Sequence, residues 1–343
     1  MDILTALNEK SDYSMLELQG IMAAWVLSSP FAGEAKMSVD NGDVSEEDYN
    51  KQSIYSLLYA IYRSIGTVES DLGISYEQVF NTWGYAWPEH WGPAPTKDND
   101  PQRFGKNAYT GHFQWDAVKS YLKEKGPAVH LVEMGCGTGA GAHHITKNVL
   151  PECTFECVDM QQAAIHTCER KFVPELGGRL KATRADCTEL PIKDATTDFV
   201  IVNETHVTEM PGEASDEDRR FFASAHRILK PGGYLLWGNA IPDSTWAPCL
   251  KVVEELGLEI VDQQDVTQLA IDARDQDAAR VEAYVQQTLN RFFGFKIPLL
   301  GNKKRLEAEA GLKNFIRHPG TNLYDNMVDG TDTYKLVIAR KPN

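Results

Sequence analysis

The stretch that decides the fold reads His130-Leu-Val-Glu-Met-Gly-Cys-Gly-Thr-Gly-Ala-Gly-Ala-His143. A short apolar run breaks into four alternating glycines, and this pattern predicts a buried strand, a tight turn and the start of a helix. Glycine has no Cβ and permits positive φ, so a ligand can lie against bare backbone at the helix N-terminus. Turns of this kind bind several nucleotide-type cofactors.

Four further motifs follow in a fixed order. The apolar run Thr154-Phe-Glu-Cys-Val-Asp159 ends in a carboxylate, where an open α/β sheet places the acid that binds ribose hydroxyls. Next come Ala185-Asp186-Cys187 and the strand-like Asp198-Phe-Val-Ile-Val-Asn203. Last is a helix that Pro231-Gly-Gly233 stops before another strand.

This order resembles the class I S-adenosylmethionine-dependent methyltransferases over residues of about 107–242 and a C-terminal strand. The family pattern is an acidic residue two positions before Gly-x-Gly-x-Gly. Glu133, followed by Gly135, Gly137 and Gly139, resembles this pattern. The resemblance implies that Asp159 holds the ribose and that Glu133 organises the glycine loop near the amino-acid end of S-adenosylmethionine. The other cofactor contacts that it implies are Met160, Asp186 and Cys187 near the adenine, and Asn203.

Two alternatives accompany this interpretation. A dinucleotide fold, and thus an NAD-type oxidoreductase, is one, because Gly135, Gly137 and Ala140 satisfy the looser Gly-x-Gly-x-x-Gly/Ala spacing. Glu133, Asp186 and the Pro-Gly-Gly turn argue against it. The other is a methyltransferase-like scaffold or regulatory subunit that binds the cofactor without transferring a methyl group.

The strand–helix alternation predicts an α/β fold with a parallel sheet and right-handed crossovers. The resemblance implies a seven-stranded Rossmann-like methyltransferase sheet with helices on both faces. We expect residues 1–100 to form a helical N-terminal extension and residues 101–343 the cofactor-binding domain. In the latter, 268–330 would be a helical substrate lid, inserted before an antiparallel strand at 334–340.

The N-terminal extension contains helical apolar spacing at 14–27 and 46–62. These helices would pack on the core or form a homodimer interface, or else form a lid. The following segment, residues 81–93, is rich in Trp and Tyr but is interrupted by Gly and Pro. It is similar to a segment that closes over the substrate in sterol and tocopherol methyltransferases, so we expect Trp83, Tyr85 and Trp87 to border the substrate site.

Candidate catalytic residues follow the fourth strand of the core. His206 could accept a proton from a hydroxyl or amine acceptor, since its unperturbed pKa lies near neutrality. Glu204 is similar in position to an acid that stabilises a carbocation in sterol and prenyl diphosphate C-methyltransferases. Trp237 is a candidate wall for the sulfonium through cation–π contact, or else a core residue.

Composition limits the partners. The formal net charge is −15, without a dense Lys/Arg cluster, which disfavours a nucleic-acid substrate. The six cysteines lack Cys-x-x-Cys pairing, so we expect reduced thiols, no zinc site and a cytoplasmic enzyme. No run approaches the about 18 apolar residues of a membrane helix. We therefore expect a methyl transfer to oxygen, nitrogen or carbon of a small metabolite, in a biosynthetic tailoring step and without a catalytic metal.

Overall fold

The computed structural model describes residues 68–69, 75–76, 80–205, 214–293 and 301–343. The two predicted N-terminal helices and His206 lie outside these residues. A short pair of strands, β1 (Val68–Glu69) and β2 (Ser75–Tyr76), precedes the main sheet.

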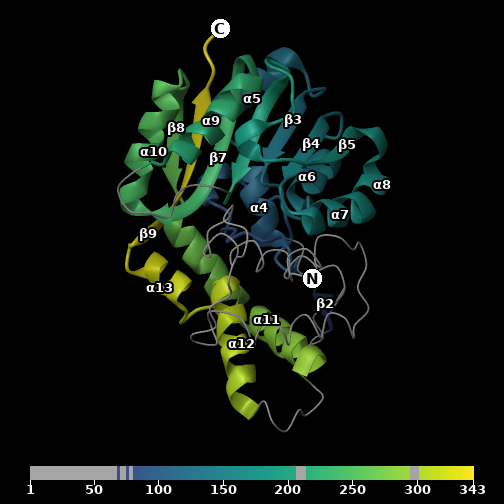
Figure 1. The fold of residues 1–343 in the computed structure, drawn as a ribbon, viewed down its shortest axis with the longest axis vertical. Helices are drawn as coiled ribbons and strands as arrows, with labels where there is room; N and C mark the ends of the chain where they lie inside the picture. The colour runs from purple at the N-terminus through teal and green to yellow at the C-terminus, as the bar shows by residue number, and fades with distance from the viewer. Residues whose placement is uncertain (1–67, 70–74, 77–79, 206–213, 294–300) are drawn as a thin grey trace, which may run out of the picture.

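The main sheet has seven strands in the order β5-β4-β3-β6-β7-β9-β8 (Figure 1). Its strands are β3 (His130–Met134), β4 (Thr154–Asp159), β5 (Leu180–Arg184), β6 (Thr197–Asn203), β7 (Leu229–Pro242), β8 (Glu259–Asp265) and β9 (Asp332–Arg340). The first five are parallel to one another, and β9 runs antiparallel between β7 and β8. The predicted seven-stranded sheet with an antiparallel last strand is confirmed.

Helices cover both faces of the sheet, as predicted. Along β3, alternate side chains point to opposite faces, so Leu131 joins one core cluster and Val132 the other. The Leu131 face is covered by α4 (Arg103–Gly111), α5 (Asp116–Lys125), α6 (Ala140–His144) with the π-helical turn η3 (Ile145–Val149), and α7 (Gln162–Lys171) with α8 (Val173–Leu176). The Val132 face is covered by α9 (Asp216–Ile228) and α10 (Asp243–Glu255).

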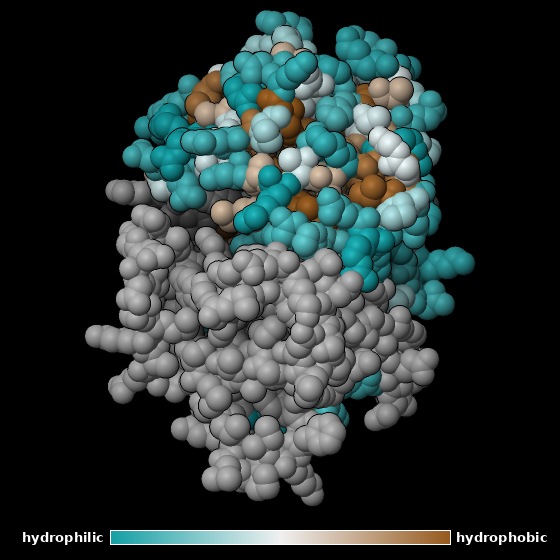
Figure 2. All heavy atoms as spheres, turned by 45° about the vertical axis from the view of Figure 1, so that its right-hand side comes forward, coloured by the Kyte–Doolittle hydropathy of each residue, from teal (hydrophilic) through white to brown (hydrophobic). Residues whose placement is uncertain are grey.

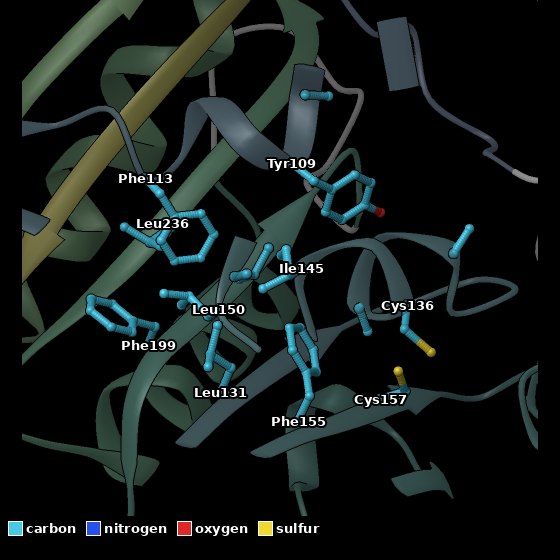
Figure 3. Packing of buried hydrophobic residues seen from close by; sticks show 14 of the residues in the cluster. Tyr109, Phe113, Leu131, Cys136, Ile145, Leu150, Phe155, Cys157, Phe199 and Leu236 are labelled. Carbon is cyan, nitrogen blue, oxygen red and sulfur yellow. The ribbon is translucent and has the colours of Figure 1, made fainter. Parts of the chain in front are cut away.

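Figure 3 shows side chains in the core on the Leu131 face of the sheet. Leu131, Phe155 and Phe199 extend from three adjacent strands toward Ile145 and Leu150. Residues 80–93, called the aromatic segment below, contribute Phe80, Trp83 and Tyr85 to this core. The aromatic segment therefore packs directly on the domain predicted to begin at residue 101.

The predicted helical insertion is present as α11 (Thr267–Phe293), α12 (Gly301–Phe315) and α13 (Asn322–Val328). In Figure 1, α11 and α12 extend together away from the sheet. Within the described residues, none of the helices combines the length and apolar character that a membrane crossing requires. On the face seen in Figure 2, hydrophilic residues dominate the described surface and hydrophobic ones form small separate groups.

Candidate active site

The glycine loop joins β3 to α6 at the carboxyl edge of the sheet, where open α/β folds bind ligands. Gly135 and Gly139 adopt left-handed φ values of 76° and 81°. A Cβ on Gly135 would lie 2.1 Å from Cγ2 of Thr205, and one on Gly139 would lie 2.4 Å from Sγ of Cys168. Glycine is therefore required at both positions by conformation and by space.

Asp159 closes the loop from the end of β4. Its carboxylate accepts hydrogen bonds from the backbone N–H groups of Gly137 and Gln161, each at 2.8 Å. Burial raises the pKa of Asp159 to about 6, an effect that these two hydrogen bonds partly offset. Met160 follows and is 49% exposed, an unusual state for a large apolar residue. An acid with an exposed apolar side chain beside it suits a ribose joined to a flat base.

The end of β5 supplies the next acid. Asp186 caps the short helix η5 (Cys187–Glu189), where its carboxylate accepts from the N–H of Thr188 at 2.8 Å. Asp186 is exposed and Cys187 is partly buried. The predicted cofactor residues at the ends of β3, β4 and β5 thus lie along one edge of adjacent strands.

Glu133, on β3, is fully buried below the loop. One carboxylate oxygen accepts a hydrogen bond from the hydroxyl of Tyr109 at 2.7 Å, whereas Oε2 is buried and has no hydrogen-bond partner among the described residues. Burial raises the pKa of Glu133 to about 8. A buried oxygen with unfilled hydrogen-bonding capacity is costly unless a ligand donor occupies it, and a cationic donor would also lower this pKa. The residue therefore fits the amino group of S-adenosylmethionine.

A second group of polar residues surrounds the ends of β6 and β7. Asn203 is buried. Among the described residues, both polar atoms of its side-chain amide lack a hydrogen-bond partner, and so does Nε2 of His112. Burial lowers the pKa of His112 to about 4, so its ring is neutral at physiological pH. The hydroxyl of Tyr85 is likewise buried and has no partner within the described part of the chain, and its ring meets that of Tyr334 edge to face at 6.0 Å. Such unfilled polar atoms suit a polar acceptor.

Sequence reasoning missed several of these residues. Tyr109, His112 and Tyr334 belong to none of the sequence motifs described above. Within the described part of the chain, no group of three or more His, Cys, Asp or Glu side chains is arranged to hold a metal ion. The helical spacing of Phe104 and Ala108 could have revealed α4, the helix that carries Tyr109.

Glu204, at the end of β6, is held by groups of the protein itself. It accepts hydrogen bonds from the hydroxyl of Thr82 and from the N–H of Trp83, and it pairs with Arg317 at 3.2 Å. Both of its carboxylate oxygens are therefore occupied by donors of the chain itself. Its role toward a carbocation stays a prediction, as does the role of His206.

The predicted aromatic residues are not all in one place. Trp83 and Tyr85 are buried, whereas Trp87 is partly exposed and donates its indole N–H to the carbonyl of Gly92 at 3.0 Å. Trp237 lies in the core on the α9–α10 face, with ring centroids 5.0 Å from Phe222 and 4.6 Å from Trp246. Trp237 is therefore a core residue, the second of the two roles that we considered for it. The next residue, Gly238, faces Asn203 and His112.

The sheet order separates the two cofactor folds that the glycine spacing left open. A dinucleotide fold has six parallel strands in the order 3-2-1-4-5-6. Here an antiparallel strand, β9, is inserted between the fifth and sixth strands of that order. Together with the glycine loop, this arrangement defines the class I methyltransferase fold.

Comparison with known proteins agrees with this class. A family described as a methyltransferase domain matches residues 131–233. A phthiotriol/phenolphthiotriol dimycocerosates methyltransferase of Mycobacterium tuberculosis is 26% identical over 266 residues, which cover 77% of this chain and 86% of that protein. Methyltransferase 1 of the same name from Mycobacterium ulcerans is 25% identical over 53% of this chain, and the match spans only 63% of that relative's length.

Solved structures share the fold at low identity. A Galdieria sulphuraria structure, assigned to the sarcosine dimethylglycine methyltransferases, has a TM-score of 0.52 at 13% identity and covers 77% of this chain and 94% of its own. The [4+2]-cyclase SpnF has a TM-score of 0.50 at 15% identity and covers 94% and 96%. With the domain match and the relatives, the fold identifies the chain as a member of the class I S-adenosylmethionine-dependent methyltransferases.

Proposed function

We propose that this enzyme binds S-adenosylmethionine at the glycine loop and transfers its methyl group to a small-molecule metabolite. The observation that carries the proposal is Oε2 of Glu133, a buried acceptor without a partner beside a loop of left-handed glycines. Asp159 ends the next strand, β4, and Asp186 follows the one after it, β5. The net charge of −15 supports a metabolite over a nucleic acid, and the six cysteines, all free thiols, support a cytoplasmic setting.

Each group of residues has a separate task in this proposal. Asp159 accepts the ribose hydroxyls, Met160 packs on the adenine, and Glu133 receives the ammonium group. When bound, S-adenosylmethionine supplies an electrophilic methyl group, and in-line attack by the acceptor releases S-adenosylhomocysteine. The protein aligns the two reactants and excludes water, which are the main requirements of such a displacement.

The acceptor side is formed by the ends of β6 and β7. Asn203, His112 and the hydroxyl of Tyr85 offer hydrogen bonds from uncharged groups for which the described residues supply no partner. They would orient an oxygen, nitrogen or carbon nucleophile of a polar metabolite. Trp83 and Tyr85 would shield it from water, whereas His206 is the predicted base where the acceptor must lose a proton.

Calorimetric titration with S-adenosylhomocysteine, with NADH run in parallel, tests the cofactor assignment. We expect S-adenosylhomocysteine alone to bind. Asp159→Ala should weaken this binding about 10- to 100-fold, because it removes charge-assisted hydrogen bonds worth about 1.5–3 kcal/mol. Asp98→Ala, an exposed residue before α4, is the matched control and should bind as the wild type does.

Other outcomes would contradict the proposal. Binding of NADH alone would restore the oxidoreductase alternative, and an unchanged affinity of Asp159→Ala would refute the pocket assignment. A protein that binds S-adenosylhomocysteine but methylates no member of a broad metabolite panel would favour the non-methylating alternative. SpnF, named as a cyclase, shows that this fold is not confined to proteins named as methyltransferases.

A further inference from the structure

Glu204 is the meeting point of three segments that are distant in the sequence. Its side chain is 3% exposed. The N–H of Trp83 donates to both carboxylate oxygens, at 2.7 and 2.9 Å, and the hydroxyl of Thr82 donates to Oε1. From the other end of the chain, Nη2 of Arg317 lies 3.2 Å from Oε2. A buried carboxylate is thus held by the aromatic segment and by the turn between α12 and α13.

The two charged partners share an uncommon backbone state. Among the described residues only three non-glycine residues have positive φ, and Glu204 at 51° and Arg317 at 59° are two of them. Left-handed backbone at such residues persists only where the surrounding contacts hold it. The guanidinium of Arg317 also lies over the ring of Trp83, with its carbon 5.5 Å from the ring centroid. Arg317 therefore contacts both the carboxylate of Glu204 and the ring of Trp83.

The neighbouring residue links this contact to the glycine loop. The hydroxyl of Thr205 donates to the carbonyl of Gly135 at 3.0 Å. The same side chain fills the space that a Cβ on Gly135 would need. The dipeptide Glu204–Thr205 therefore touches the cofactor loop on one side and both outer segments on the other.

We infer that Glu204 is a positioning residue that fastens the aromatic segment and the α12–α13 turn to the end of β6. Because Thr205 is hydrogen-bonded to the glycine loop, binding of a cofactor to this loop would also reduce the local opening of both segments. Both oxygens of Glu204 already accept hydrogen bonds from the aromatic segment, as a residue that positions this segment would. The inference rests on the proposed function only in treating this edge as the acceptor side.

Hydrogen exchange of the full-length protein, followed by mass spectrometry, tests the inference. Peptides covering 80–92 and 312–328 report on the two fastened segments. We expect Glu204→Gln and Arg317→Met each to speed exchange about 10-fold or more in both peptides, because each removes one charge of the buried ion pair and leaves the other charge without its counter-ion. The double variant should exchange no faster than the single ones, since both remove the same contact.

Two variants separate positioning from general loss of structure. Arg317→Lys keeps a cation and should restore most of the wild-type protection. Glu255→Gln is the matched control, since it breaks the exposed Arg219–Glu255 pair on the opposite face and should leave both peptides unchanged. Thr82→Val removes one donor alone and should loosen only the peptide 80–92.

The dependence on the cofactor loop is measured by adding S-adenosylhomocysteine. In the wild type it should slow exchange in both peptides. In Glu204→Gln it should still bind, with an affinity within about threefold, and yet leave the peptide 312–328 unprotected. If Arg317→Met does not alter 80–92, or Glu204→Gln does not alter 312–328, Glu204 does not join the segments. If S-adenosylhomocysteine fails to bind even the wild type, the proposed function fails, while the exchange comparison without ligand still decides the fastening.

Discussion

At the scale of single residues, the position of Trp237 along β7 determines that its side chain lies in the core and not in the candidate site. Successive side chains of a strand point to opposite faces, so Trp237 and Leu235 pack on the α9–α10 face. Leu236 joins the cluster on the other face, and Gly238 faces Asn203. The ring of Trp237 is fully buried and meets Phe222 and Trp246.

This position predicts a loss of stability without a loss of binding. Trp237→Ala should lower the free energy of unfolding by about 3–5 kcal/mol, the usual effect of removing a buried large aromatic side chain. The folded fraction should keep the wild-type affinity for S-adenosylhomocysteine. Urea unfolding and calorimetry measure the two quantities. A fall in affinity with little change in stability would instead place Trp237 at the cofactor, as a wall.

Residue roles could be predicted from the sequence only where the contacts are local. Asp159 reaches Gly137 across 22 positions, but the strand and glycine patterns that align them are short and regular. Glu204 was found as an important acid, but its partners Thr82 and Arg317 lie more than a hundred positions away on either side. No local pattern encodes such a meeting, so its fastening role required the structure.

At the scale of elements, α4 connects the two halves of the site. Tyr109 on α4 and His112 at its C-terminal end are three positions apart and so lie on one face of the helix. Tyr109 reaches Glu133 beside the cofactor loop, and His112 lies beside Asn203. The helix can approach α6 closely because Gly141 has no side chain there. A Cβ at Gly141 would lie 1.9 Å from a ring carbon of Tyr109.

Gly141→Ala should therefore displace Tyr109 and break its hydrogen bond to Glu133. We expect a loss of about 1–3 kcal/mol in unfolding free energy, as for other overpacked interiors, and a weaker affinity for S-adenosylhomocysteine. The matched control is Gly178→Ala, where a Cβ would meet no atom within 4 Å and the change should stay within about 0.5 kcal/mol. Equal behaviour of the two variants in unfolding and calorimetry would show that α4 is not tightly docked on α6.

The strands were the elements that the sequence predicted best. Buried strands end at local signals, such as the glycines after Met134 or the acid that ends β4, so the runs that form β3, β4, β6 and β7 could be recognised in the sequence. The helix α4 has apolar residues at helical spacing, but no local pattern indicates its tertiary contact from Tyr109 to Glu133.

At the scale of the whole molecule, four buried titratable groups set opposing pH dependences of stability. Burial raises the pKa of Glu133 from 4.5 to about 8 and that of Asp159 from 3.8 to about 6. It lowers the pKa of His112 and of His144 from 6.5 to about 4. The carboxyl contributions are present at low pH and are lost as the pH rises through the folded values, and the histidine contributions are lost as the pH falls below 6.5. Between pH 6.5 and 8, Glu133 makes the largest single contribution to the change in stability, opposed in part by the two histidines, which are still half protonated in the unfolded chain at pH 6.5.

The protein without ligand should therefore lose stability over this interval, by about 1–2 kcal/mol attributable to Glu133, because one pKa unit corresponds to about 1.4 kcal/mol. Glu133→Gln keeps an oxygen that can accept from Tyr109 and should remove this part of the slope. Saturating S-adenosylhomocysteine should remove it in the wild type, since its ammonium group would lower the pKa of Glu133. Urea unfolding at several pH values measures all three cases. Parallel slopes for the wild type and Glu133→Gln would mean that Glu133 is already ionised in the folded protein, and an ammonium group would then gain no proton-linked affinity there.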